Sequence, residues 1–365
     1  MLLHVSYDDK FVDMSIRQFS EVSSIPQLLV VISGSAQLKY VKSPADVISV
    51  NQLNNYIRKS MGKHEITAVI FHSLRPYKLK LPSSLVKVWI GMGFDYYDYI
   101  NIPLYSNRTK KLLRDKVSGS KIKSFILNRR KKRLAKDMDI FCPVIQEEYE
   151  LLKDKVDINK TIDWNYGYLS DWIGSDNIDN PINIGDENLL LVGNSADPSN
   201  NHIDVIEDVA NSLYKDQQLI VPVSYGSQEY LCRLEKEISN YHIVNRVKLI
   251  KTFMSIDRYT EMLMDCKYAI MNHYRQQALG NIITLLYFGK TVYLRSDNPL
   301  YAYLRRLGVI IKDVEDVANK GFASISLDNA ISNRAIISRL YSKDYVDNKS
   351  RNLLNEIKKI SATKR

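Results

Sequence analysis

The sequence has few of the features that mark membrane-spanning, secreted or fibrous proteins. It contains three cysteines, ten prolines and fourteen glycines among 365 residues. Cys142, Cys232 and Cys266 lie far apart without metal-ligand spacing, so we expect reduced thiols in a cytosolic protein. No apolar run reaches the roughly 20 residues that span a bilayer. The N-terminus, MLLHVSYDDK, has no basic region before its apolar residues, so we do not expect a signal peptide.

The positive charge of the chain is concentrated in one segment. The composition, 45% hydrophobic and 25% charged, is typical of a soluble globular protein, and the net charge is +10. Residues 108–136 contain thirteen Lys or Arg and one Asp, a net +12, so the rest of the chain carries −2. This uneven distribution argues against a protein built throughout to neutralise nucleic acid, and we expect no nucleic-acid partner.

The basic segment also contains apolar residues, among them Leu112, Leu113 and Phe125, and ends in a cluster of cations. The cluster consists of Arg129, Arg130, Lys131, Lys132 and Arg133. One interpretation is an ordinary solvated helix face. The functional interpretation is an amphipathic surface that binds anionic lipid, to which each Lys or Arg contributes about 1 kcal/mol. Nucleic-acid binding is a third alternative, but no nucleic-acid motif accompanies the charge.

The alternation of strands and helices predicts an α/β protein with two Rossmann-like domains whose parallel sheets face across a cleft. The first domain, 1–165, contains the basic segment, and the second covers 186–340, after an irregular linker at 157–187 rich in Asn, Asp and Gly. A C-terminal helix within 341–365 could cross back to the first domain. We expect strands at 2–5, 28–32, 66–71, 86–90 and 139–141 in the first half, with a helix over 46–59. In the second half we expect strands at 189–192, 219–223, 247–250, 268–271, 292–294 and 309–311.

The stretch 189–203, LLLVGNSADPSNNHI, is a predicted strand, a turn of small polar residues and the start of a helix. Gly193 permits a sharp bend, and Asn194 and Ser195 follow it. One interpretation is an ordinary capped turn. The other is a phosphate or diphosphate site, because free N–H groups at a helix start attract anions.

Three further strand ends in the second half carry polar side chains. They contribute Tyr225 after the strand 219–223, Arg275, Gln276 and Gln277 after 268–271, Gly280 and Asn281 at the entry to the next helix, and Asn298 after 292–294. A guanidinium group and several amides around helix N-termini can hold a diphosphate without a metal ion. We therefore expect no metal and no cofactor. Donors placed at the leaving diphosphate would stabilise the transition state of glycosyl transfer.

Four segments in this order resemble one family of bacterial enzymes. They are LLVGNSADPSNNHI, VPVSYG, YRQQALGNIITLLYFGKTVYL and SDNPLY, with weaker similarity in IFHSLRP and VWIGMGFDYYDY. They resemble the N-acetylfucosamine (4-acetamido-4,6-dideoxygalactose) transferases of enterobacterial common antigen synthesis. The resemblance implies a GT-B fold and metal-independent transfer from a dTDP-sugar to a polyprenyl-diphosphate-linked glycan. It also implies a cytoplasmic enzyme held peripherally on the inner face of the bacterial inner membrane.

The resemblance also assigns residues to the two substrates. The donor would meet Gly193, Asn194, Ser195, His202, Tyr225, Arg275, Gln276, Gln277, Gly280 and Asn281. On the acceptor side, the residues that match the family's strand-end pattern are His72, Trp89, Gly91 and Asp95. The family's Trp-Gly-Ala-Asp segment is longer here, Ile90 to Asp95, and the first hundred residues diverge most. The acceptor could therefore be an O-antigen or capsule intermediate instead of the common antigen.

A general base is needed if the transfer inverts the configuration of the sugar. We expect Asp95 first and His72 second in this role. Two other classes of function stay open from the sequence. One is another nucleotide-sugar enzyme, such as an epimerase or hydrolase, and the other is a non-catalytic protein whose basic segment binds a membrane or RNA.

Overall fold

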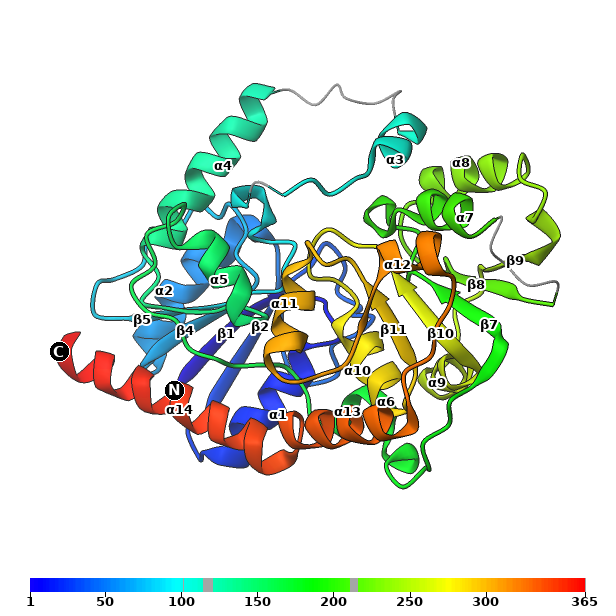
Figure 1. Ribbon diagram of the computed structural model, residues 1–365. Coiled ribbons are helices and arrows are strands. Elements are labelled where there is room, and N and C mark those ends of the chain that lie inside the picture. The colour runs from blue at the N-terminus through cyan, green and yellow to red at the C-terminus, as the bar shows by residue number, and fades with distance from the viewer. Residues whose placement is uncertain (101, 114–120, 211–215, 365) are drawn as a thin grey trace. The chain divides into compact units, whose positions relative to one another are not determined.

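The computed structural model describes residues 1–100, 102–113, 121–210 and 216–364 and, over 121–127, the helical backbone alone. It contains two α/β units, each built on a six-stranded parallel sheet (Figure 1). The first unit comprises Met1–Asn101, Gly119–Tyr168 and Tyr341–Arg365, and the second comprises Ile102–Ser118 and Leu169–Leu340. Among the described residues, no helix combines the length and apolar character needed to cross a bilayer.

The sheet of the first unit has the strand order β3-β2-β1-β4-β5-β6. Its strands are β1 (Leu2–Tyr7), β2 (Gln27–Ile32), β3 (Asp46–Ile48), β4 (Ala68–His72), β5 (Val86–Ile90) and β6 (Ile140–Cys142). The central strands are continuous apolar runs, as expected when helices cover both faces of a parallel sheet. In register, Leu3 lies between Leu28 and Val69.

The part of this unit that the structure describes also contains α-helices. They are α1 (Val12–Val22), α2 (Leu53–Lys63), α4 (Lys121–Lys136), α5 (Gln146–Leu152) and α14 (Lys343–Lys364). Leu353, Leu354 and Ile357 of α14 are buried in one cluster with Phe19 of α1 and Trp164. Each such side chain contributes about 1.5–3 kcal/mol on burial, so the C-terminal helix is an integral part of the first unit.

The sheet of the second unit has the order β12-β11-β10-β7-β8-β9. Its strands are β7 (Asp186–Val192), β8 (Gln218–Pro222), β9 (Val247–Ile250), β10 (Cys266–Met271), β11 (Thr291–Leu294) and β12 (Lys312–Asp313). The α-helices are α3 (Asn107–Leu112), α6 (Leu169–Ile173), α7 (His202–Ala210), α8 (Gln228–Ile238), α9 (Ile256–Asp265), α10 (Leu279–Tyr287), α11 (Pro299–Arg306), α12 (Val314–Lys320) and α13 (Leu327–Leu340). All residues of α10 from Ile282 to Tyr287 are buried, as expected for a helix that is apolar on all sides.

Both sheets have the same doubly wound topology. Numbered within its own unit, each follows the order 3-2-1-4-5-6, so the winding direction reverses between the first and fourth strands. Ligands of such sheets bind beyond the carboxyl ends of the strands at this switch point. The relevant positions therefore follow β1 and β4 in the first unit, and β7 and β10 in the second.

The fold class is the predicted one, but several elements differ from the expected pattern. Residues 46–48 form β3 instead of beginning a helix, because the Ser49 amide and hydroxyl bond the Gln52 side chain and delay α2 until Leu53. The last strand is β12 at Lys312–Asp313 and not 309–311. Residues 102–113 belong to the second unit, although the predicted first domain was continuous over 1–165.

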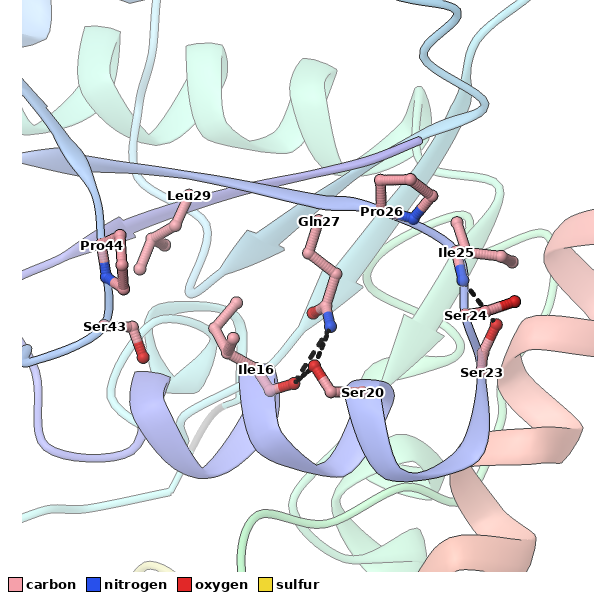
Figure 2. A pocket seen from close by; sticks show the side chains of 10 residues that line it. All are labelled: Ile16, Ser20, Ser23, Ser24, Ile25, Pro26, Gln27, Leu29, Ser43 and Pro44. Carbon is pink, nitrogen blue, oxygen red and sulfur yellow. Dashed lines mark hydrogen bonds between the residues drawn. The ribbon is translucent and has the colours of Figure 1, made fainter.

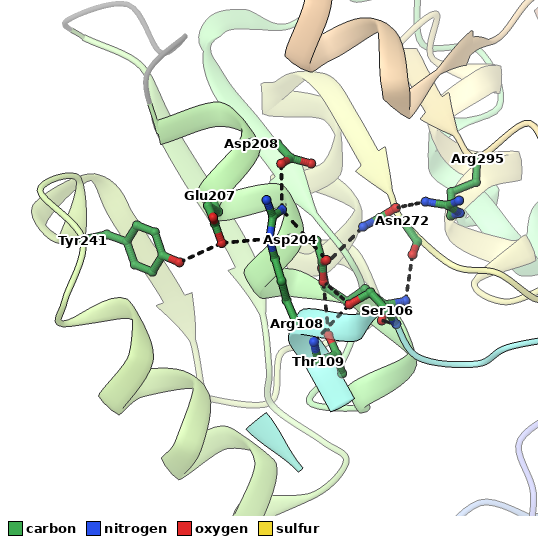
Figure 3. Close-up of polar contacts among 10 residues, drawn as sticks. Ser106, Arg108, Thr109, Asp204, Glu207, Asp208, Tyr241, Asn272 and Arg295 are labelled. Atoms are coloured by element: carbon green, nitrogen blue, oxygen red, sulfur yellow. Dashed lines mark hydrogen bonds and ion pairs between the residues drawn. The ribbon is translucent and has the colours of Figure 1, made fainter. Parts of the chain in front are cut away.

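The reason for this last difference is a set of ion pairs on α3 (Figure 3). Arg108 pairs with Glu207 and Asp208 of α7 at 2.9 and 2.8 Å. The Ser106 hydroxyl donates to Asp204 at 2.6 Å and accepts from the Thr109 amide. Arg108, the first cation of the predicted membrane-facing segment, therefore anchors α3 to α7.

Candidate active site

The turn after β7 is organised around Gly193 and a buried asparagine. Gly193 has φ +66°, a conformation that side chains with a Cβ disfavour. The Asn194 amide donates to Asn200 Oδ1 at 3.0 Å, and Asn200 Nδ2 donates to the carbonyl oxygens of Ser195 and Asp197. Asn200 is fully buried. Its side chain thus replaces the hydrogen bonds that a regular helix would give these groups, and it fixes the turn.

A continuous hydrogen-bond network joins the ends of β7, β8 and β10. Arg275 Nε donates to Gln277 Oε1 at 3.1 Å, and Gln277 Nε2 donates to Asn194 Oδ1 at 3.2 Å. Asn194 Nδ2 in turn donates to the Tyr225 hydroxyl at 2.9 Å. Ser199 adds a 2.6 Å bond to Gln277 Oε1. Predicted residues from three separate segments are therefore in direct contact at the switch point of the second sheet.

The backbone near Arg275 carries further donors. Ala278 has φ +58° and leads into α10 without a side-chain cap, so the first amides of α10 have no capping side chain. Asn298, the N-cap of α11, donates to the carbonyls of His273 and Arg275 at 2.8 and 2.9 Å. A planar guanidinium group just before the N-terminus of a helix is an arrangement suited to a diphosphate.

The other predicted donor residues lie around this network. His202 is fully buried against the Tyr230 hydroxyl at 3.0 Å, and burial lowers its pKa to about 3. It is neutral at physiological pH and supports the turn from the interior of the unit. Gln276 is buried, and Asn281 donates to the Tyr259 hydroxyl at 2.7 Å. Gly280 packs against the Trp172 ring, where a Cβ would lie 2.6 Å from the ring.

Sequence reasoning missed a second guanidinium group at the same edge. Arg295 directly follows β11, contacts Asn272 Oδ1 at 3.4 Å and lies 3.9 Å from the ring centroid of Tyr274. Asp297 holds its other nitrogens at 2.8 Å. Its position after a strand was a usable signal. Its pairing with Asp297 was not visible before the fold was known.

The acceptor-side residues of the first unit have structural contacts. Asp95 is buried, and its oxygens accept from the amides of Leu74 and Met92 and from Trp89 Nε1, at 2.7–2.9 Å. Burial raises its pKa, while these donors lower it. Asp95 thereby holds the turn at Ser73, which has φ +70°. With all these donors engaged, the geometry does not favour Asp95 as a proton acceptor.

His72 and the two other residues predicted for this side are also enclosed. His72 Nδ1 faces the Tyr166 hydroxyl at 2.8 Å, and Nε2 faces His4 Nδ1 at 3.0 Å. Burial holds the pKa of His72 well below its usual range. Trp89 is fully buried, and Gly91 packs against the ring of Tyr96. None of these side chains is available to an acceptor in this conformation, and their predicted roles stay predictions.

The five cations of the predicted membrane cluster lie on different faces of α4. In α4, Arg129, Arg130, Lys132 and Arg133 are exposed. Lys131 is buried, pairs with Asp98 at 3.0 Å and lies over the ring of Tyr99. Leu134 and Ala135 are buried on the same side. The apolar face of this half of α4 therefore packs on the protein itself, and four of the five cations remain for an external surface. The apolar residues at 122 and 125–127 lie outside the side chains that the structure describes.

One sizeable cavity lies away from all these residues (Figure 2). It has a volume of about 380 Å³ and lies between α1, the start of β2 and Pro44. Gln27 at its wall donates to the Ile16 carbonyl at 3.1 Å and to the Ser20 hydroxyl at 2.7 Å. The cavity lies at the amino-terminal end of β2, so it is not at the edge where a ligand of this sheet is expected.

Comparison with known proteins identifies the type of enzyme. Residues 176–355 match the family model described as 4-alpha-L-fucosyltransferase, glycosyl transferase group 56. A glycosyltransferase from Rickettsia africae has a similar structure, with a TM-score of 0.65, 14% identity and 98% of each chain covered. HepE from Anabaena in complex with UDP has a TM-score of 0.62 and 12% identity over 97% of this chain and 99% of that one. WaaG, a glycosyltransferase of lipopolysaccharide biosynthesis, has a TM-score of 0.59 and 11% identity over 98% of this chain and 99% of that one.

These findings decide between the classes of function left open by the sequence. At such low identity the structural likeness establishes the fold, and the match of residues 176–355 supports a glycosyltransferase enzyme. The protein is a glycosyltransferase of the GT-B fold whose residues 176–355 match the 4-alpha-L-fucosyltransferases of group 56.

Proposed function

We propose that the protein transfers an amino-deoxy sugar, such as N-acetylfucosamine, from dTDP to a polyprenyl-diphosphate-linked glycan. The product would be an intermediate of a bacterial surface polysaccharide, such as common antigen, O-antigen or capsule. The single observation that carries the proposal is the network from Arg275 through Gln277 and Asn194 to Tyr225. The likeness of its sequence segments to the N-acetylfucosamine transferases supports the choice of sugar.

The chemistry of the network fits a nucleotide-sugar donor. The guanidinium group of Arg275 and the uncapped amides of α10 supply positive charge for the leaving diphosphate. Negative charge builds up on the diphosphate as its bond to the sugar breaks. These positive groups therefore stabilise the transition state more than the ground state. We therefore propose transfer without a metal ion. HepE from Anabaena binds UDP, so UDP is the natural competitor of dTDP in any test.

The donor is tested by thermal shift with dTDP, UDP and GDP, followed by sugar variants of the best nucleotide. We expect dTDP to raise the melting temperature most. Binding stabilises the native state by about 2.7 kcal/mol when the ligand is at 100 times its Kd. The transfer itself is then measured with a dTDP-sugar and a lipid-linked acceptor. Nucleotide-sugar hydrolysis or epimerisation without transfer to the acceptor would contradict the proposal.

The acceptor proposal includes peripheral association with the inner face of the inner membrane. The four exposed cations of the cluster in α4 support it, because at about 1 kcal/mol each they would contribute roughly 4 kcal/mol to binding on an anionic surface. Flotation with vesicles that contain anionic lipid is the test. Failure to float at low salt would contradict membrane association without affecting the donor proposal.

A further inference from the structure

The carboxyl edge of the first sheet carries few acidic side chains. In the segments that connect β1 to α1, β2 to β3, β4 to β5 and β5 to α3, the acids are Asp8, Asp9, Asp95 and Asp98. A group that takes a proton from a substrate needs an accessible lone pair within hydrogen-bond reach. Among these four carboxylates, only one with an oxygen free of other partners meets this requirement.

Three of the four carboxylates have other tasks. Asp8 accepts from the amides of Lys39, Tyr40 and Val41 at 2.6–3.0 Å and thus holds the loop after β2. Asp95 is buried and holds the turn after β4, as described above. Asp98 forms the ion pair with Lys131 at 3.0 Å.

Asp9 differs from them. It is the second residue after the end of β1, so it lies at the switch point of the first sheet. Its Oδ1 accepts from the Phe11 amide at 3.0 Å, an arrangement that fixes the carboxylate to its own turn. Its Oδ2 has no hydrogen-bond partner in the part of the chain that the structure describes, and the residue is half-buried.

The surroundings of Asp9 are suited to proton transfer. Partial burial raises its pKa above the usual range, which brings a carboxylate closer to neutral pH. The charged and titratable groups that act on it are Lys10, Asp8 and Arg75, and it acts in turn on Tyr166. The Tyr166 ring packs on Phe11 at 5.5 Å between centroids. A pair of aromatic rings thus lies close to Asp9.

We propose that Asp9 accepts the proton of the attacking hydroxyl of the acceptor. This inference rests on the proposed transfer to a hydroxyl group. In the step, the hydroxyl oxygen bonds to the anomeric carbon of the sugar. The bond from that carbon to the diphosphate breaks and its electron pair leaves with the diphosphate. The hydroxyl proton passes to Oδ2 of Asp9, which replaces Asp95 and His72 as the expected proton acceptor.

Asp9→Asn, Asp9→Glu and the control Asp154→Asn test the inference in the full-length protein. Asp154 is an exposed acid of the same unit, outside any site described here. Asp9→Asn should lower kcat roughly 10²–10⁴-fold. Its melting temperature and its thermal shift with dTDP should equal those of the wild type. The acidic limb of the wild-type pH–rate profile should disappear in this variant and return, with part of the rate, in Asp9→Glu.

The outcomes separate this inference from the proposed function. An active wild type with an Asp9→Asn variant within about threefold of it, and with the same acidic limb, would overturn the role of Asp9 alone. A wild type that binds nucleotides but transfers no sugar to any hydroxyl acceptor would overturn both proposals. A loss of rate in Asp9→Glu equal to that in Asp9→Asn, with a lowered melting temperature in both, would assign Asp9 to folding instead.

Discussion

Gly193→Ala is the substitution whose effect follows most directly from the geometry of the turn after β7. A Cβ at residue 193 would lie 2.6 Å from Asn200 Oδ1 and 2.7 Å from His202 Nε2. Neither atom can move without cost, since Asn200 and His202 are fully buried. The positive φ of residue 193 adds strain to any residue with a Cβ.

The expected magnitude is the sum of two terms. A left-handed conformation costs a non-glycine residue about 1–2 kcal/mol. Displacement of Asn200 Oδ1 leaves the Asn194 amide unpaired in the interior, which costs about 1–3 kcal/mol. The total is about 2–5 kcal/mol, equivalent to a fall of roughly 5–20 °C in melting temperature for a unit of this size. The same displacement moves Asn194 and should weaken nucleotide binding.

The matched control is Gly308→Ala in the same unit. Gly308 has φ +85°, but a Cβ there would meet one atom within 4 Å, Ile336 Cδ1 at 3.7 Å, an ordinary contact. It should cost only the backbone strain and leave the nucleotide thermal shift unchanged. Melting curves of both variants with and without dTDP provide the test. A Gly193→Ala variant that melts and binds dTDP like the wild type would refute the description of the turn.

Three further predictions concern the first unit, the membrane surface and the metal. Burial raises the pKa of Glu148 from about 4.5 to about 7. The folded state therefore binds the proton more tightly than the unfolded state, and this stabilisation is complete below pH 4.5 and is lost as the pH rises to 7. The free energy of unfolding should fall by about 3 kcal/mol over this range, and Glu148→Gln should abolish the fall in denaturant titrations. Replacement of the exposed cations Arg129, Arg130, Lys132 and Arg133 by Ser should weaken binding to anionic vesicles about 10²–10³-fold in sedimentation assays. EDTA should leave the transfer rate unchanged.

Each of these predictions has its own control. The control for Glu148→Gln is Glu150→Gln, a substitution of an exposed acid in the same helix. Lys131→Ala should lower the melting temperature and have little effect on vesicle binding, since Lys131 pairs with Asp98 inside the protein. A vesicle affinity that depends on Lys131 as strongly as on its exposed neighbours would contradict this division of α4. Restoration of an EDTA-treated enzyme by Mg²⁺ or Mn²⁺ would contradict metal-independent transfer.

The sequence predicted the parallel sheets well, because their evidence is local. Apolar runs such as 189–192 and 86–90 end at polar turns, and these periodicities survive in β7 and β5. The short β3 and β12 were missed or displaced because each depends on pairing with a neighbouring strand. A three-residue strand such as 46–48 carries no periodicity of its own.

The grouping of the residues proposed to bind the donor was also predictable from the sequence. Gly193, Asn194, Tyr225, Arg275 and Gln277 follow strands of one sheet, and parallel strands bring their carboxyl ends to one edge. The sequence pattern could not predict which of the residues near this edge face the proposed ligand and which support the turn from the interior. His202 supports the turn instead, because it is fully buried and its Nδ1 lies 3.0 Å from the hydroxyl of Tyr230, a residue distant in the sequence.

The first unit shows why position after a strand is insufficient to assign a general base. Asp95 and Asp9 both follow strands, and the sequence alone does not show which carboxylate has both oxygens occupied by hydrogen bonds from backbone amides. Asp95 accepts from Leu74, which is twenty-one residues away in the chain. Asp9 is bonded to its own turn and keeps one oxygen free of partners among the described residues. Such differences arise from tertiary contacts, which single-residue patterns do not encode.

The most direct test of the account is calorimetric titration of the protein with the nucleoside diphosphate that stabilises it most. The wild type and two variants, Arg275→Ala and the exposed control Arg305→Ala of α11, are compared. Loss of a charge-assisted contact to the diphosphate costs about 1.5–3 kcal/mol, so Arg275→Ala should bind about 10- to 100-fold more weakly, with Arg305→Ala unchanged. Equal affinities of the wild type and Arg275→Ala, or no binding of any nucleoside diphosphate to the wild type, would contradict a donor site at the switch point of the second sheet.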